Sequence, residues 1–422
     1  MRDTRHTPLT NDHIGTFANE LGPIKEVHAF WLAGMSCDGC SVAAVGAQNP
    51  SVEQLLNQDI PGLPKVILHH PVLAVTAGEA FMEPYYQAAK GELDAPFVVL
   101  YEGSVADEQI AEDHGGYWSA MGMEHMADGS WRPYPTAKML RDMAPHAAAV
   151  IAVGTCATWG GIPAAQGNVT HAMATMDYLG KNYRSALGLP VVNIPGCAPV
   201  GDNITEAITA VLMFLAGVGP LPDFDELGRP AWMFKSTVHR GCTRAGSYEE
   251  GVFAEKYGDP ECLVELGCWG PVVQCNIVAR GALGHNGGCM NTGGVCIGCT
   301  MPGFPDAFAP FYKAPPGKTV SATASRMLGS FIKPLRRISQ RKGNMTNRWN
   351  KTGHIPSGWG HVEAPGPLMK TAHYFYRKLQ SADSNYTPGG TALQRKLQAA
   401  SHSYIKDAEA KADKRMHEEA KA

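Results

Sequence analysis

The sequence predicts an α/β fold built on a mostly parallel sheet. Five short runs rich in apolar and β-branched residues recur along the first half of the chain, and stretches with helical patterning separate them. The runs are continuously apolar rather than alternating, which is typical of strands buried on both faces. Strands that alternate with helices in this way form parallel sheets.

The elements follow in order along the chain. We expect strands at 27–32, 65–70, 97–102, 148–154 and 190–195, and helices at 80–92 and 201–216. Four regions result: an N-terminal arm (1–24), an α/β domain (25–230), an irregular domain (231–310) and a C-terminal extension (311–422). The extension carries a basic patch formed by Lys333, Arg336, Arg337, Arg341, Lys342, Arg348 and Lys351. We favour oligomer contacts for it, and the alternatives are a solvated face, contact with anionic lipid and docking of an electron acceptor. The end of the extension, from residue 391 onward, is patterned as a helix.

Charge and composition limit the functions to consider. A net charge of −3 over 422 residues argues against a general affinity for nucleic acid. The polar N-terminus lacks the apolar segment of an export signal, and the longest apolar run, 208–218, is too short to cross a bilayer. We therefore expect a cytoplasmic protein, with peripheral membrane association through partners as the alternative. In a reducing compartment, the 11 cysteines favour metal binding over disulfides.

Four cysteines follow the predicted strands. Cys37 and Cys40, in M-S-C-D-G-C-S, come after the first run, Cys156 after the fourth and Cys197 after the fifth. Open parallel sheets bind ligands at the carboxyl ends of their strands. We therefore expect these four thiols, the first set, to converge on one place.

The remaining cysteines lie in a stretch from about Lys235 that is rich in glycine and has little periodic pattern. Such a segment needs metal to hold it together. Spacing divides its potential ligands into a second set (His239, Cys242, Cys262, Cys268) and a third set (Cys275, Cys289, Cys296, Cys299). Three sets of four match three cubane [4Fe–4S] clusters, since each cubane takes four protein ligands and imidazole suits iron.

Other uses of the cysteines remain open on spacing alone. A lone C-x-x-C also occurs in redox pairs and zinc sites, and three zinc ions would likewise use twelve ligands. Zinc sites usually combine paired knuckles, however, whereas only Cys37/Cys40, His239/Cys242 and Cys296/Cys299 form knuckles here. The spacing therefore favours iron–sulfur clusters.

Seven motifs in order resemble the small, electron-transferring subunit of nickel–iron hydrogenases. They are M-S-C-D-G-C-S, E-G-S (Glu102 to Ser104), G-T-C-A-T-W-G-G, P-G-C-A-P, H-R-G-C-T-R, C-L-V-E-L-G-C-W-G-P and C-I-G-C-T-M-P-G-F-P-D. The resemblance covers about residues 25–310. With no export signal and a long tail, the chain is most similar to the soluble actinobacterial type.

The resemblance implies a flavodoxin-like domain and a role for each set. The first set would hold a proximal cluster, the second a distal cluster, and Cys275, Cys296 and Cys299 a medial cluster. In the family a proline often stands at the fourth medial position and leaves a [3Fe–4S] cluster. In this chain Cys289 occupies the fourth medial position, so we expect a medial [4Fe–4S] cluster, with [3Fe–4S] as the alternative.

Departures from the family pattern adjoin the first set. Asp38 replaces the usual Thr. Its side chain could contact the proximal cluster or serve as a ligand of it; the alternative is a solvated or capping side chain. Val42 replaces a Glu, which casts doubt on any proton relay through that position. Oxygen-tolerant members carry two extra cysteines at the positions of Gly39 and Gly161. This sequence therefore lacks the two extra cysteines of the oxygen-tolerant members.

The resemblance also implies the reaction and the partners. A large-subunit partner would hold the nickel–iron centre, and this chain would carry electrons from hydrogen oxidation one at a time to an unidentified acceptor. Trp159 and Trp269 would shield clusters or serve as ordinary core residues. We expect a dimer of heterodimers or a larger assembly. The alternative is a quinone-reductase-type electron-transfer subunit, which shares the proximal domain but normally lacks a segment like 239–299.

Overall fold

The computed structural model describes residues 24–305, except 114, 166, 181 and 226, together with Met327. The described residues form two compact units, 24–232 with 302–305 and 233–301. Apart from Ile24 and Met327, the predicted N-terminal arm and C-terminal extension lie outside the described residues, and so do the basic patch and the predicted terminal helix.

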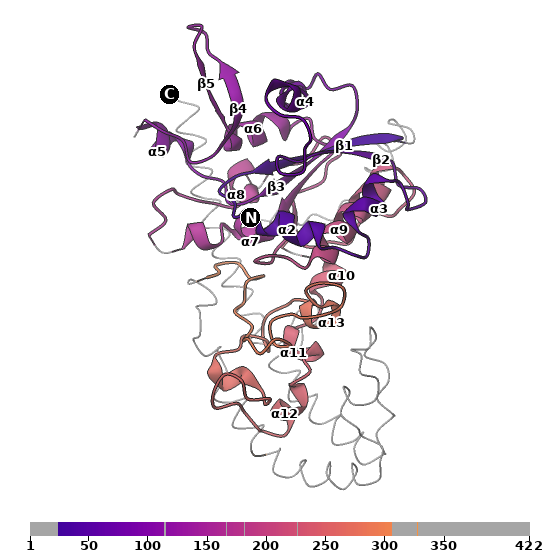
Figure 1. Ribbon diagram of the computed structural model, residues 1–422, viewed down its shortest axis with the longest axis vertical. Coiled ribbons are helices and arrows are strands. Elements are labelled where there is room, and N and C mark those ends of the chain that lie inside the picture. Colours follow the sequence, from indigo (N-terminus) through magenta and orange to yellow (C-terminus); the bar gives the residue numbers. More distant parts are fainter. Residues whose placement is uncertain are drawn as a thin grey trace. The chain divides into compact units, whose positions relative to one another are not determined.

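A five-stranded parallel sheet forms the centre of the first unit (Figure 1). Its strands are β1 (Glu26–Ala33), β2 (Lys65–His69), β3 (Phe97–Glu102), β6 (Ala149–Val153) and β7 (Val192–Ile194), in the order β2-β1-β3-β6-β7. All five lie where the apolar runs predict them. The order reverses between β1 and β3, as in flavodoxin-like sheets, so the predicted α/β fold is confirmed.

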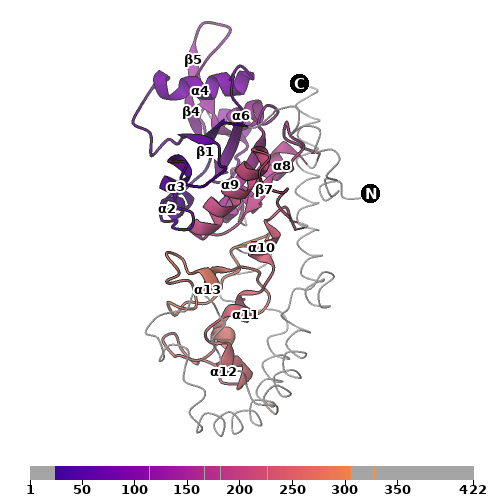
Figure 2. The ribbon, with the colours of Figure 1, turned by 90° about the vertical axis from the view of Figure 1, so that its right-hand side faces the viewer.

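Helices cover both faces of this sheet (Figures 1 and 2). On one face lie α4 (Glu79–Lys90) and α6 (Thr136–Met143), and on the other lie α2 (Gly39–Val45), α3 (Val52–Leu56) and α9 (Gly201–Leu215). The predicted helices at 80–92 and 201–216 correspond to α4 and α9. Coverage of both faces explains why the strands are apolar throughout.

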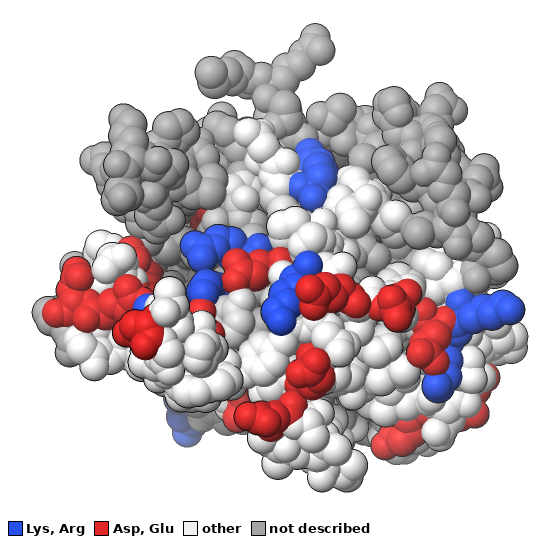
Figure 3. All heavy atoms as spheres, turned by 90° about the horizontal axis from the view of Figure 1, so that it is seen from above, with Lys and Arg blue, Asp and Glu red and all other residues white. Residues whose placement is uncertain are grey.

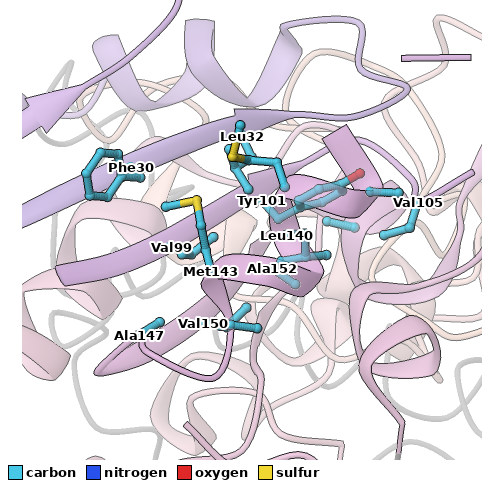
Figure 4. Packing of buried hydrophobic residues seen from close by; sticks show 14 of the residues in the cluster. Phe30, Leu32, Val99, Tyr101, Val105, Leu140, Met143, Ala147, Val150 and Ala152 are labelled. Carbon is cyan, nitrogen blue, oxygen red and sulfur yellow. The ribbon is translucent and has the colours of Figure 1, made fainter. Parts of the chain in front are cut away.

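Alternate strand residues form the core under α6. Phe30, Leu32 and Tyr101 are buried there and pack with Leu140 and Met143 of the helix (Figure 4). The intervening strand residues point to the opposite face, because successive side chains of a strand alternate. This packing fixes the strand ends from which the first set projects.

Several elements of the first unit are not evident from the sequence. They are α5 (Glu108–Asp113), the antiparallel pair β4 (Ala120–His125) and β5 (Trp131–Pro135), α7 (Gly154–Trp159), a 3₁₀ turn (Ile162–Ala164) and α8 (Thr175–Leu179). Across the β4–β5 pair, Arg132 Nε donates to Glu124 Oε1 at 2.7 Å. Viewed from the side of α4 and this hairpin, acidic and basic side chains are interspersed over the described surface (Figure 3).

The second unit consists of short turns around its own core. Its helices are α11 (Val238–Gly241), α12 (Ala245–Glu249) and α13 (Ile277–Arg280), with a 3₁₀ turn (Leu263–Leu266), and α10 (Ala231–Phe234) leads into it. Cys242, Cys268 and Cys296 belong to its buried core together with Trp269. Across the described parts of both units, none of the helices has the length and apolar character needed to cross a membrane.

A histidine at the end of β2 makes stability depend on pH. The His69 ring stacks on Phe30 at 4.5 Å, and His69 Nε2 lies 3.0 Å from His28 Nδ1. Burial, followed by the charge of His28, lowers the pKa of His69 from 6.5 to about 4. The unfolded chain binds this proton more readily, so the free energy of unfolding falls as the pH drops from about 6.5 to about 4 and is unaffected by this group above that range.

We expect His69→Leu to weaken this acid sensitivity, because leucine cannot take up a proton. Thermal unfolding midpoints of the variant and the unaltered protein, compared near pH 7.5 and near pH 5, measure the effect. The midpoint of the variant should fall less on acidification. An equal fall in both proteins would contradict the prediction.

Candidate metal centres

The carboxyl ends of three strands position the first set. Cys37 follows β1, and Cys40 lies in the first turn of α2. Cys156 lies in α7 directly after β6, and Cys197 follows β7. Cys40 is buried, Cys156 is half-buried, and Cys37 and Cys197 are exposed. The predicted placement of the thiols at the ligand-binding edge of the sheet therefore agrees with the structure.

The four thiols are close enough to affect one another's ionisation. Burial raises the pKa of Cys40 far above its ordinary value, and the charges of Glu102, Cys156, Cys37 and Cys197 raise it further. Burial, followed by the charge of Cys197, raises the pKa of Cys156 to about 11. The raised pKa values make Cys40 and Cys156 weak nucleophiles, which argues against activation of Cys40 as a member of a redox pair. A multivalent metal centre would supply the positive charge that lets all four ionise together.

Two glycines adjoin the thiols of this set. A Cβ added at Gly39 would lie 3.2 Å from Cys37 Sγ, and one at Gly161 would lie 2.7 Å from Cys156 Sγ. Gly161 also has a φ of +58°, where a side chain is strained. These are the two positions at which oxygen-tolerant relatives are expected to carry extra cysteines, and here both leave space free beside a thiol.

A buried carboxylate lies beside the first set. Glu102 Oε1 accepts hydrogen bonds from the amides of Cys40 at 2.9 Å and Ser41 at 3.4 Å. Glu102 Oε2 accepts from Trp31 Nε1 at 2.8 Å and from Ser41 Oγ at 2.5 Å, and Ser41 Oγ lies 3.0 Å from His70 Nε2. Sequence patterns do not reveal this network, because its members are distant along the chain. The one visible signal is an acidic residue that ends the apolar run F-V-V-L-Y-E.

Asp38 lies at the start of α2 with a φ of 58°. Its side chain makes no capping hydrogen bond to the helix, so the capping alternative is wrong. Its amide donates to Ser36 Oγ at 3.0 Å, and the side chain is exposed. The charge of Asp38 opposes the effect of burial, which lowers the pKa of His70. Contact between Asp38 and a cluster stays a prediction.

An exposed apolar patch adjoins the first set. It consists of Val42 and Val45 on α2 and Val72, Leu73 and Val75 in the loop after β2, and Val42 is 72% exposed. The Val72 amide donates to His70 Nδ1 at 3.1 Å, and His70 contacts Ser41 of α2, so the loop lies beside the helix. Exposed apolar patches of this kind mark surfaces that bind other proteins.

Three thiols and an imidazole of the second set are buried in the second unit, with Cys242 and Cys268 in its main core and Cys262 in a smaller cluster. Burial raises the pKa of Cys262, the charges of Cys268 and Cys242 raise it further, and Arg244 opposes them. Burial lowers the pKa of His239 to about 4, so its imidazole is neutral at neutral pH, as a metal ligand must be.

The third set lies in the same core. Burial and the charges of Cys268, Cys289 and Cys299 raise the pKa of Cys296 well above its ordinary value. Cys289 is therefore close to the C-I-G-C pair, as its proposed role requires. Cys275 is half-buried and packs against the same core.

The second and third sets meet at one pair of residues. The Cys296 amide donates to Cys268 Sγ at 3.3 Å, and the Trp269 amide donates to the Cys296 carbonyl at 2.8 Å. Trp269 is 2% exposed and lies between these backbone segments. Trp159 is equally buried but belongs to the core under α6.

The donor chemistry of all three sets fits iron–sulfur clusters. Within the described ranges, no group of three or more His, Cys, Asp or Glu side chains is arranged to hold a single metal ion. In a cubane each thiolate binds a different iron, so the ligands surround a larger core. Cysteine thiols that can ionise when a metal binds, a neutral imidazole and glycines that leave space beside the thiols suit such a core.

Two protein families match different parts of this chain. Residues 234–312 match the family of the C-terminal region of NiFe/NiFeSe hydrogenase small subunits. Residues 37–211 match the family of the 20 kDa subunit of NADH ubiquinone oxidoreductase. The first match contains the second and third sets, and the second match contains the first set.

Individual proteins are similar over most of the chain. The periplasmic [NiFeSe] hydrogenase small subunit of Desulfomicrobium baculatum is 32% identical over 292 residues, which are 69% of this chain and 88% of that protein. The quinone-reactive Ni/Fe-hydrogenase small chain of Wolinella succinogenes is 28% identical over 328 residues, 76% of this chain and 83% of that protein. The structure of the actinobacterial-type NiFe-hydrogenase from Ralstonia eutropha H16 contains a chain with 47% identity and a TM-score of 0.72, covering 81% of this chain and 97% of that one.

Proposed function

We propose that this chain, which belongs to the small-subunit family of nickel–iron hydrogenases, relays electrons from hydrogen oxidation in a large-subunit partner to an acceptor. Small subunits of this family are components of heteromeric hydrogenases and carry iron–sulfur clusters. The proposed path runs through a proximal cluster at the first set, a medial cluster at the third and a distal cluster at the second.

The observation that carries this proposal is the contact between the second and third sets. A relay needs consecutive cofactors near each other, and the hydrogen bond between the Cys296 amide and Cys268 Sγ links a ligand of one proposed cluster to a ligand of the next. Both residues are buried in an apolar core, which excludes water from the path.

Each cluster, when bound, takes up and passes on one electron. The residues of this chain hold it, orient its ligands and set its surroundings. Burial keeps His239 neutral, so the distal site has one negative ligand fewer than the other two. A smaller negative charge raises the reduction potential, which suits the last site of an outward path.

The large subunit would dock on the apolar patch. Cys37 and Cys197 of the proximal set are exposed, and Val42 and Val45 of the exposed apolar patch lie on α2, the helix that carries Cys40. Association would cover both the apolar surface and the exposed thiols, and would place the partner's nickel–iron centre next to the first cluster of the path.

Metal analysis tests the cofactors of the purified heteromeric complex. We expect about thirteen irons and about twelve acid-labile sulfides per copy of this chain, four of each from three clusters and one further iron from the partner's nickel–iron centre. Hydrogen-dependent dye reduction should accompany them and should disappear when the large subunit is removed. Zinc in place of iron would contradict the proposal, and about twelve irons with an unchanged sulfide content would favour the [3Fe–4S] alternative at the medial site.

A quinone-reductase-type subunit is the runner-up. The match of residues 37–211 to the NADH ubiquinone oxidoreductase family supports it for the first unit. The hydrogenase-specific match of residues 234–312, which holds eight of the twelve proposed ligands, opposes it. Dye reduction that requires hydrogen and the large subunit distinguishes the two.

We also propose a cytoplasmic location and an assembly at least as large as a dimer of heterodimers. The larger assembly is supported by the basic patch of the extension. Cell fractionation and the native mass of the purified complex test these two points.

A further inference from the structure

His70 and Ser41 each donate a hydrogen bond in the direction of the Glu102 carboxylate. The Val72 amide donates to His70 Nδ1, so in the neutral ring the proton lies on Nε2 and is donated to Ser41 Oγ. The single hydroxyl proton of Ser41 is then donated to Glu102 Oε2. His70 and Ser41 therefore form a chain of aligned dipoles with its positive end at the carboxylate.

The charge of Glu102 acts directly on the first set. Its Oε1 lies 2.9 Å from the Cys40 amide nitrogen, and the carboxylate is 1% exposed, so water screens it little. A negative charge this close to Cys40 and this little screened disfavours added negative charge at the sulfur. An electron added to a cluster on this sulfur would meet the same repulsion.

We propose that Ser41 and His70 are positioning residues for the proximal cluster, because their hydrogen bonds partly neutralise Glu102 and thereby raise the reduction potential of the cluster. This inference rests on the proposed function, since it requires a cluster at the first set. Ser41 contacts the carboxylate itself, whereas His70 acts through Ser41, so the effect of Ser41 should be the larger.

The test measures the potential of the proximal cluster in the purified heteromeric complex by redox titration followed with electron paramagnetic resonance. Ser41→Ala should shift this potential to a lower value, and His70→Leu should shift it in the same direction by less. The medial and distal potentials should stay unchanged, because the hydrogen bonds of Ser41 and His70 run to Glu102, which contacts Cys40 of the first set. His69→Leu is the matched control: it alters the adjacent histidine of β2, which packs against Phe30 and His28 instead, and should leave all three potentials unchanged.

Iron content and thermal stability identify variants that still assemble, and the potential of either assembled variant decides the question. An unchanged or raised proximal potential in Ser41→Ala or His70→Leu would overturn the proposal, as would an equal shift in His69→Leu. Measurements on the unaltered complex distinguish a failure of this proposal from a failure of the proposed function. If it holds three clusters and reduces dye with hydrogen while the variants keep its potentials, only the role of Ser41 and His70 fails.

Discussion

Replacing Cys40 by alanine is expected to reduce hydrogen-dependent dye reduction by the complex to background. Cys40 is the most enclosed thiol of the first set, and its amide is held by Glu102 at 2.9 Å. Gly154, with a φ of +88°, leaves the space beside the sulfur, and a Cβ there would overlap Cys40 Sγ. Alanine would leave this enclosed position empty, so the proximal cluster should lose a ligand and the electron path its first step.

The measurement is dye reduction together with iron content. Iron should fall by about four per chain, because the remaining thiols of the set include the exposed Cys37 and Cys197. Ser185→Ala is a suitable control, since it removes a buried hydroxyl that donates to the Ala148 carbonyl in the same unit without adjoining the thiols. It should lower stability by about 1 kcal/mol and retain the clusters. Full dye reduction by Cys40→Ala would contradict the proposed role of the first set.

The parallel sheet can be predicted from the sequence because its strands are buried on both faces. Burial on both faces requires each strand to be apolar without interruption. An apolar run of five or six residues can be recognised in the sequence without any knowledge of the fold. The β4–β5 hairpin gives no such signal. Its second strand, W-R-P-Y-P, contains Pro133 and Pro135, and proline argues against a strand unless it lies at an edge. The three-dimensional structure, and not the sequence, shows that this pair forms a separate two-stranded sheet.

The thiol sets are predictable for a similar reason. Parallel strands all end at one edge of the sheet, so cysteines directly after β1, β6 and β7 must approach each other. The Glu102 network follows no such rule. Trp31, Ser41 and His70 meet the carboxylate only because β1, α2 and β2 pack around the end of β3, and tertiary packing of this kind leaves no spacing in the sequence.

In the third set, replacing Cys289 by alanine is expected to convert the medial [4Fe–4S] cluster to [3Fe–4S]. The thiol is close enough to Cys296 for its charge to raise the pKa of that residue. The loop itself does not depend on the sulfur, because the Cys289 carbonyl accepts hydrogen bonds from the Gly294 amide at 2.8 Å and from Thr292 Oγ1 at 3.1 Å. Alanine should therefore keep the loop in place and leave one iron corner without a ligand.

Iron should fall by about one per chain, and the oxidised complex should show a new [3Fe–4S] resonance signal. The potential of the medial cluster should rise, since a negatively charged thiolate has been removed. Thr292→Val is the matched control, because it removes a hydrogen bond to the Cys289 carbonyl and keeps the thiol. It should retain the iron content of the unaltered complex, with about four irons in each cluster, and show no new signal. Unchanged iron content in Cys289→Ala would show that another residue fills the fourth position.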